Sequence, residues 1–332
     1  MIRWRRVLAI AGIAFALAPG TFIKARQPAV IEDAPLMITP LAYDGARTSA
    51  GWSVTGLWAL ESGNSRFGGF SALEVRQDGA GARRFLALSD TGDYMNFVLE
   101  KGEQPMRLLS VAGGNGPKVA ADVESAAYDP VTGRVWLAYE FRNMIERRDP
   151  KTFAPDGSVE PEVMADWGAN SGPESMARLA DGRFIVISEG RRGTPDGTHR
   201  AILFDGDPVE GAAETPFRFR PPDGYRPVGM TALPGGKVAI LLRAVRIGLP
   251  PHFESAVAIA DPSAIRKDET WEGAVAVSLA PPFPSDNFEG ITSTTGPGGS
   301  VTLWLISDDN FATLQRTLFA RIDYTPRNRR AR

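Results

Sequence analysis

A strand-like pattern recurs five times along this chain, and this recurrence limits the possible folds more than any other feature. Each copy begins at a small residue, and after a turn an apolar run of about six residues follows. Successive copies are 50 to 61 residues apart. A strand-filled repeat of this length is typical of β-propellers, in which each repeat forms one blade. The small residues that begin the copies are Ser71, Ser125, Ser175, Gly229 and Gly290.

The apolar runs have the length and composition of buried strands. Each is rich in Val, Ile, Leu or aromatic residues, and clusters of Gly, Asp, Asn and Pro separate it from its neighbours. Gly and Pro account for 35 and 26 of the 332 residues, which suits many tight turns and argues against a helical bundle. The runs are RFLALS at 84–89, RVWLAY at 134–139, RFIVIS at 183–188, KVAILL at 237–242 and TLWLIS at 302–307.

Each unit has room for a four-stranded antiparallel meander. In the fifth unit, segment 317–324 supplies the third strand, and the outer strand is missing at that end of the chain. We expect the strand-like segment 51–62 to fill this place, because joining the two ends of the chain removes an exposed sheet edge. We therefore predict an all-β propeller with five blades of four strands. The alternatives are a sixth blade formed before residue 62 and, as a different architecture, two β-sandwiches.

The N-terminus has the pattern of an export signal. Three arginines within the first six residues precede an apolar run at 7–18, which is shorter than the roughly 20 residues of a membrane-spanning helix. We expect residues 1–27 to be a signal peptide or, alternatively, an uncleaved anchor. Residues 28–326 would then form a single propeller domain, and the basic residues 327–332 a solvated tail. The expected location is periplasmic or secreted, and an uncleaved anchor would be the only contact with a membrane.

Composition excludes several classes of site and partner. The chain has no Cys and two His, which rules out disulfides, thiolate nucleophiles, zinc–thiolate sites and multi-histidine metal centres. It has 39 acidic and 37 basic residues, whereas nucleic-acid-binding proteins usually carry a large basic excess. We therefore expect no nucleic-acid partner. The expected state is a monomer.

The meander brings polar residues of all five units to one mouth of the propeller channel. The first strand of a blade starts at the face to which the second strand returns, so residues before strand one and after strand two converge. Glu precedes the small residue in three units, as Glu124, Glu174 and Glu289. The other residues at these places are Asp122, Arg226, Asp286, Asn287, Asp90, Asp93, Glu140, Asn143, Glu189, Arg191, Arg192, Arg243, Asp308, Asp309 and Asn310.

Carboxylates gathered in this way repel one another unless positive charge compensates them. Ca²⁺ takes about six to eight oxygen ligands and needs neither His nor Cys. Arginine pairs with carboxylates or holds a phosphate or carboxylate group. A metal beside arginines suits hydrolysis of a phosphate ester.

A structural role for these residues is the competing interpretation. Asp and Asn satisfy backbone groups at turns, and the SDDN run at 307–310 is not a complete EF-hand loop. Glu is not a favoured turn residue, although ion pairs between blades would also explain it. His199 and His252 lie in loop-like sequence and are interpreted as surface or packing residues. No G-x-S-x-G motif supports an α/β-hydrolase.

The motifs resemble those of the bacterial family called "esterase-like activity of phytase", or phytase-like, over about residues 50–325. The resemblance implies an exported β-propeller that hydrolyses esters or phosphoesters at shared acidic residues. The calcium-dependent, six-bladed alkaline phytases are a more remote likeness. Gly229 is a departure, because relatives are expected to carry Asp there, so this blade would lack one acid. The motifs are FGGFSAL (67–73), ALSDTGD (87–93), DVESAAYDP (122–130), NSGPESMARLADGRF (170–184), GYRPVGMTALPGG (224–236), DNFEGI (286–291) and LWLISDDNFATLQRTLF (303–319).

We predict an exported hydrolase of ester or phosphoester bonds, assisted by a divalent metal. The alternatives are a non-catalytic propeller with structural calcium and a lactonase-like hydrolase. The expected cofactor is Ca²⁺, and its expected ligands are Asp308, Asp309, Asp90, Asp93, Asp286 and Glu189. The expected catalytic residues are Glu289, Glu124 and Glu174, which bind the metal or activate water, and Arg226 and Arg243, which hold the substrate anion.

Overall fold

The computed structural model describes most of the chain. The expected signal at 1–27, the expected tail at 327–332 and Arg192 lie outside the described residues. The described residues are 31–77, 83–112, 122–168, 171–191, 194, 197–247, 252–312 and 315–326.

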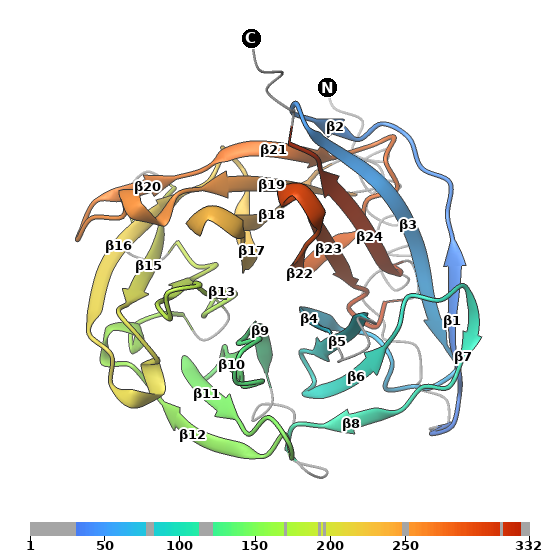
Figure 1. Cartoon of the computed structure of the whole chain (residues 1–332), viewed down its shortest axis with the longest axis horizontal. Helices are drawn as coiled ribbons and strands as arrows, with labels where there is room; N and C mark the ends of the chain where they lie inside the picture. The colour runs from blue at the N-terminus through green and yellow to red at the C-terminus, as the bar shows by residue number, and fades with distance from the viewer. Residues whose placement is uncertain are drawn as a thin grey trace, which may run out of the picture.

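Five small antiparallel sheets surround a central channel and form a five-bladed β-propeller (Figure 1). Blade one contains β4 (Phe70–Gln77), β5 (Arg83–Ser89), β6 (Asp93–Phe97) and β8 (Leu108–Ser110). Blade two contains β9 (Val123–Tyr128), β10 (Val135–Tyr139), β11 (Met144–Arg148) and β12 (Pro155–Val159). Blade three contains β13 (Ser175–Arg178), β14 (Phe184–Ile187), β15 (His199–Phe204) and β16 (Glu214–Arg220), with β20 (Thr270–Glu272) added in parallel.

The last two blades recruit strands from the N-terminal part of the chain. Blade four contains β17 (Arg226–Ala232), β18 (Val238–Arg246), β19 (His252–Ala260), β21 (Ala274–Leu279) and β2 (Arg47–Thr48). Blade five contains β22 (Asn287–Thr295), β23 (Val301–Asp308), β24 (Thr317–Tyr324), β3 (Trp52–Ser62), β1 (Leu36–Pro40) and β7 (Gly102–Gln104). The described helices are all short 3₁₀ turns: η2 (Glu162–Met164), η3 (Pro208–Glu210), η4 (Pro234–Gly236), η5 (Pro262–Ala264) and η6 (Pro297–Gly299).

The five apolar runs of the sequence each form the second strand of a blade, which confirms the predicted five-bladed arrangement. In blade three, for example, all four residues of β14 are buried. Second strands are covered on both faces by neighbouring blades, so their apolar residues run continuously without a polar alternation. Between blades one and five, the rings of Phe85 and Phe319 meet edge to face with centroids 5.0 Å apart.

The N-terminal strand closes the ring, as the sequence predicts. Strand β3 pairs antiparallel with β24 along its whole length, from Leu60 opposite Thr317 to Trp52 opposite Tyr324. In Figure 1 the two strands lie side by side, although they come from opposite ends of the chain. The blade thus gains an outer strand, and the edge of β24 is covered.

Small residues in the first strands let the five blades approach one another around the channel. The Ser71 hydroxyl donates to the Val123 carbonyl of the next blade at 2.5 Å, and the Ser125 hydroxyl donates to the Pro173 carbonyl at 2.6 Å. A Cβ atom at Gly290 would lie 3.0 Å from the Cβ of Leu73 in blade one. These short approaches explain why the repeat begins with Ser or Gly.

The same approaches constrict the channel at its middle. The space there is about 10 Å³, whereas a cavity of about 850 Å³ opens where the first strands end. The channel therefore has two separate mouths, and the acidic one lies where the first strands begin.

No helix in the described part of the chain is long and apolar enough to cross a membrane.

Candidate functional site

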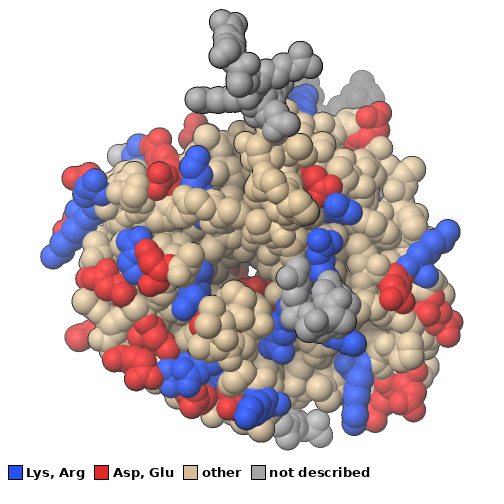
Figure 2. Space-filling view, in the orientation of Figure 1, with Lys and Arg blue, Asp and Glu red and all other residues tan. Residues whose placement is uncertain are grey.

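The acidic mouth is built from the starts of first strands and the ends of second strands, as the meander predicts. Figure 2 shows the molecule along the channel axis, with charged side chains of both signs over the rim. The carboxyl groups of Glu124, Glu174 and Glu289 are close enough to raise one another's pKa. The structure therefore brings together the three glutamates that recur in the repeat.

One group of carboxylates has the spacing of a metal site. Asp122, Glu124 and Glu140 each offer a ligand oxygen, and these oxygens all lie within 4.8 Å of one another. The fold holds them together because Asp122 and Glu124 flank the start of β9. Glu140 follows β10 and its backbone N–H donates to the Asp122 carbonyl at 2.9 Å. The sequence placed Asp122 and Glu140 at this mouth but assigned them no role.

A fourth oxygen lies beside this group. The side-chain oxygen of Asn143 is buried without a hydrogen-bond partner, and the residue is 7% exposed. A Cβ atom at Gly172 would lie 2.9 Å from that oxygen and 3.0 Å from the Glu140 Cγ, so both side chains adjoin the same small space. Three carboxylates and an unpaired amide oxygen are the donor set that a hard cation such as Ca²⁺ accepts.

Burial and mutual repulsion shift the protonation of these glutamates. Burial, followed by repulsion from Glu289 and Glu140, raises the pKa of Glu124 well above its usual range. Burial and the charge of Glu124 act in the same way on the pKa of Glu174. Burial raises the pKa of Glu140 to about 7, although a hydrogen bond shared with Glu174 lowers it. A carboxyl group with a raised pKa keeps its proton to a higher pH than an exposed one.

Arg243 supplies the positive charge on the opposite side of the mouth. Its guanidinium donates to Glu289, to the Asn287 side-chain oxygen at 2.8 Å and to Glu189 at 2.5 Å. Burial lowers the pKa of Arg243, but attraction to Glu289 and Glu189 outweighs this effect and raises it. Arg243 therefore joins a carboxylate of blade three to one of blade five from its own place in blade four. These partners accept three hydrogen bonds from the five N–H donors of its guanidinium.

The other expected metal ligands have protein partners of their own. Asp93 is paired with Arg66, and Glu189 is paired with Arg243 and, at 3.4 Å, with Arg226. Asp286 accepts from the backbone of Asn287 and Arg316, Asp309 from Gly69, Phe311 and Thr317, and Asp308 from Asn310 and Asn287. Asp90 accepts from the Ser89 hydroxyl at 3.2 Å. Asp286 and Asp309 thus fix the turns that shape the mouth.

His199 occupies a different environment from the loop position that the sequence suggested. It begins β15 and is fully buried. Its Nδ1 lies 3.0 Å from the Ser188 carbonyl, and its Nε2 accepts from the Nε of Arg191 at 3.2 Å. The residues before His199 have the composition of a loop. Nothing in the sequence indicates that its side chain is buried or that its Nδ1 contacts the Ser188 carbonyl.

The departure at Gly229 has a steric reason in this chain. A Cβ atom there would lie 2.4 Å from the Glu289 carbonyl oxygen, closer than any real Cβ contact.

We expect Gly229→Ala to lower the free energy of unfolding by about 1–3 kcal/mol, because the inner strands of blades four and five must separate. Thermal unfolding should show a clear loss, whereas the control Gly63→Ala, with its nearest neighbour at 3.6 Å, should change little. Equal effects would mean that the approach is not tight.

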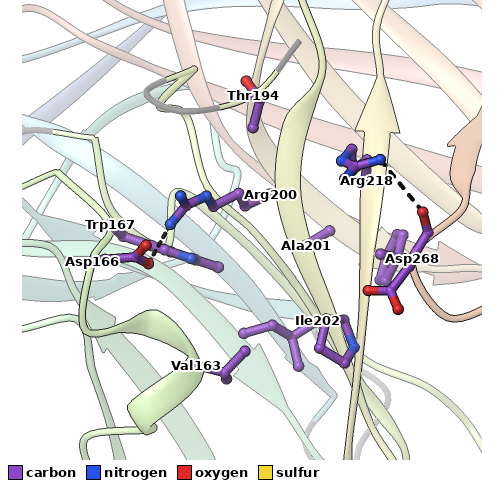
Figure 3. A pocket seen from close by; sticks show the side chains of 11 residues that line it. Val163, Asp166, Trp167, Thr194, Arg200, Ala201, Ile202, Arg218 and Asp268 are labelled. Atoms are coloured by element: carbon purple, nitrogen blue, oxygen red, sulfur yellow. Dashed lines mark hydrogen bonds and ion pairs between the residues drawn. The ribbon is translucent and has the colours of Figure 1, made fainter.

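A further pocket lies away from the channel, at the outer edge of blade three (Figure 3). It encloses about 320 Å³ between β15, β16 and the segment that carries Trp167. Arg200 pairs there with Asp166, and Arg218 donates to the Asp268 carbonyl at 3.4 Å. The mouth residues do not line this pocket, so it is separate from the candidate site.

Comparison with known proteins gives one family. A sequence model of the family described as "Phytase-like: Esterase-like activity of phytase" matches residues 65–311. No curated protein matches the chain.

Several solved structures show a low level of similarity to this chain. Glutaminyl cyclase from Myxococcus xanthus has 13% identity and a TM-score of 0.45, with 88% of this chain and 100% of that chain covered. A hypothetical protein from Leishmania major has 13% identity and a TM-score of 0.41, with 94% of both chains covered. Hydrazine synthase from Kuenenia stuttgartiensis has 13% identity and a TM-score of 0.39, with 75% of this chain covered, and this chain spans 59% of that one.

Proposed function

This chain belongs to the phytase-like family, described as having esterase-like activity of phytase, and from that premise we propose that it hydrolyses ester or phosphoester bonds at its acidic mouth with a divalent cation. The observation that carries the proposal is the grouping of Asp122, Glu124 and Glu140 beside the unpaired oxygen of Asn143. Carboxylates gathered at one place repel one another unless positive charge compensates them. Their retention at one site is explained if they hold a cation.

The cation expected at this site is Ca²⁺, because all donors are hard oxygens. When bound there, it would act as a Lewis acid that polarises the ester or phosphoryl oxygen of the substrate. This assignment moves the metal site from the predicted ligands of blades one, three and five to blade two. Glu124 is common to both assignments.

We assign a separate proton transfer to each of the two other glutamates, Glu174 and Glu289. Glu174 has a raised pKa because it is buried and lies near other carboxylates, so we assign it the transfer of a proton to the leaving group. Glu289 lies beside Arg243, which lowers its pKa against the effect of burial. We therefore assign Glu289 the acceptance of a proton from the attacking water. Two acids with different environments are the usual arrangement for paired proton transfers.

The test is turnover together with metal binding. After EDTA treatment, Ca²⁺, Mg²⁺ or Mn²⁺ is added back, and release of p-nitrophenol from its phosphate and acetate esters is measured. We expect one metal to restore hydrolysis and to raise the Tm, because a ligand that binds only the folded state stabilises it. Glu124→Gln should lower kcat/KM by roughly 100-fold and greatly reduce the Tm rise, because it replaces a negatively charged ligand by a neutral amide.

Glu210→Gln is the matched control, since Glu210 lies on η3 outside the mouth. It should leave both readouts unchanged. A metal-dependent Tm without turnover on any ester would favour the non-catalytic, calcium-binding alternative. If neither turnover nor Tm responds to a metal, the proposal is wrong. Activity on lactones without phosphate release would favour the lactonase-like alternative.

The proposal includes export. It is supported by the N-terminal arginines and the apolar run at 7–18. Extracellular calcium-binding modules have dissociation constants of about 10⁻⁴–10⁻³ M, so a weak calcium site would suit an exported enzyme. The proposed partner is a small-molecule ester or phosphoester, and the proposed working form is a monomer.

A further inference from the structure

Three described arginines lie on the side of the mouth formed by blades three and four, and they differ in their hydrogen-bond and ion-pair partners. Arg243 is bonded to two carboxylates and an amide. Arg226 is 54% exposed and reaches Glu189 at 3.4 Å. Arg191 is exposed, and among the described residues no carboxylate forms an ion pair with it. Among these three described arginines, Arg191 is therefore the one without a carboxylate partner in the described part of the chain.

The Arg191 side chain is nevertheless held in place. Its Nε donates to the Nε2 of His199 at 3.2 Å, and its Nη2 donates to the Tyr225 carbonyl at 2.6 Å. His199 belongs to blade three, and Tyr225 immediately precedes the first strand of blade four. The guanidinium therefore bridges two blades at the mouth. An arginine fixed in this way loses less conformational entropy when it binds an anion than a free surface arginine.

The protonation state of His199 suits this role. Its Nδ1 lies 3.0 Å from the Ser188 carbonyl, which can only accept, so Nδ1 carries the proton and Nε2 is free to accept from Arg191. Burial, together with the charge of Arg191, lowers the pKa of His199 to about 4. The imidazole is therefore neutral at ordinary pH, and its acceptor nitrogen is available.

We propose that Arg191 binds an anionic group of the substrate at the rim of the mouth and that His199 is the residue that positions it. This inference rests on the proposed function and narrows its substrate class to esters that carry a negative charge. Arg243, one of the two arginines that the sequence suggested for this task, already donates to Glu289, Glu189 and Asn287. Arg226 lies on the same side of the mouth, next to Glu189, and can donate a further hydrogen bond to the same anion.

The direct test uses inorganic phosphate as the probe, with the full chain in EDTA so that no metal takes part. Phosphate should raise the Tm of the unmodified protein in a concentration-dependent way. Arg191→Gln should weaken the apparent phosphate affinity about tenfold, because a charge-assisted bond is lost. The matched control is Arg200→Gln, since Arg200 lies on the same blade but lines the separate outer pocket.

Two His199 variants test the positioning role. His199→Gln can place an acceptor near the position of Nε2, whereas His199→Asn can replace only Nδ1. We expect His199→Asn to raise KM for p-nitrophenyl phosphate about tenfold with kcat little changed, and His199→Gln to restore much of the loss. KM for the neutral p-nitrophenyl acetate should change in neither variant, which a general loss of structure would not produce.

Failure of this inference can be told apart from failure of the proposed function. A phosphate-induced Tm rise that is equal in the unmodified protein and in Arg191→Gln overturns the inference, even if hydrolysis is observed. A protein whose Tm does not respond to phosphate at all overturns it as well. A response that needs Arg191 in a protein without measurable turnover upholds the anion site and contradicts only the catalytic proposal.

Discussion

Deletion of residues 1–62 is expected to leave the chain unable to fold, whereas deletion of residues 1–28 is expected to have a far smaller effect. The longer deletion removes β3, and with it the buried side chains of Leu57 and Leu60. Loss of a buried Leu typically costs about 2–5 kcal/mol, and a domain has only about 5–15 kcal/mol of stability. The deletion also exposes the edge of β24, which carries the buried residues Leu318, Ala320 and Ile322.

Far-UV circular dichroism during heating measures this difference. The longer deletion should show no cooperative transition or should aggregate. The 28-residue deletion should unfold cooperatively. If both truncated chains unfold at the same temperature, closure by β3 contributes little to stability, and the ring is held by the remaining strands alone.

Arg243→Met is expected to destabilise the protein by about 3–5 kcal/mol, because it leaves the buried carboxylates of Glu189 and Glu289 without their counter-ion. For a chain of this size, that corresponds to a fall in Tm of roughly 10 °C. Arg226→Met is the matched control. It removes a largely exposed arginine from the same Glu189 and should cost about 1 kcal/mol or less.

The Arg243 variant should also show a characteristic pH dependence. Burial raises the pKa of Glu289, and Arg243 opposes that effect, so the variant should have a still higher pKa at Glu289. A carboxyl group whose pKa is higher in the folded state than in the unfolded state favours folding at low pH. That stability is lost as the pH rises through the folded-state pKa.

The measurement is Tm against pH with EDTA present. The Arg243→Met protein should lose stability more steeply than the unmodified protein as the pH rises above about 4.5, the ordinary pKa of Glu. Adding Glu289→Gln should flatten the curve. Parallel curves for the single variant and the unmodified protein would show that Arg243 does not compensate these acids.

The fold could be derived from the sequence because its signals are local and repeated. Five apolar runs of strand length, bounded by turn residues, predict five second strands, and β5, β10, β14, β18 and β23 occupy those places. The missing outer strand of the last unit and the spare segment 51–62 together predict the closure that β3 makes. Periodicity of this kind reports burial directly, since a strand between two blades must be apolar throughout.

The composition of the mouth was also derived from the sequence, because strand direction alone decides which residues meet there. Glu124, Glu174 and Glu289 precede the small residues of their units, and the structure brings them together. The sequence did not distinguish an acid that is available to a ligand from one that accepts backbone hydrogen bonds in a turn. Asp286 and Asp309 accept backbone hydrogen bonds, and that use depends on loop conformations that no periodicity encodes.

The roles within the mouth were decided by tertiary structure alone. The three carboxylate oxygens of Asp122, Glu124 and Glu140 meet within 4.8 Å only after β9 and β10 have paired. Arg243 is paired with two carboxylates, and Arg191 has no carboxylate partner among the described residues, because of which side chains the neighbouring blades bring within reach. The sequence by itself determined the repeat, the closed ring and the acidic character of one mouth. Which acids lie within ligand distance of one another, which arginine is paired with carboxylates and which histidine is buried depend on contacts between residues of different strands and blades. Such contacts are set by side-chain distances of a few ångströms, which spacing along the chain does not specify.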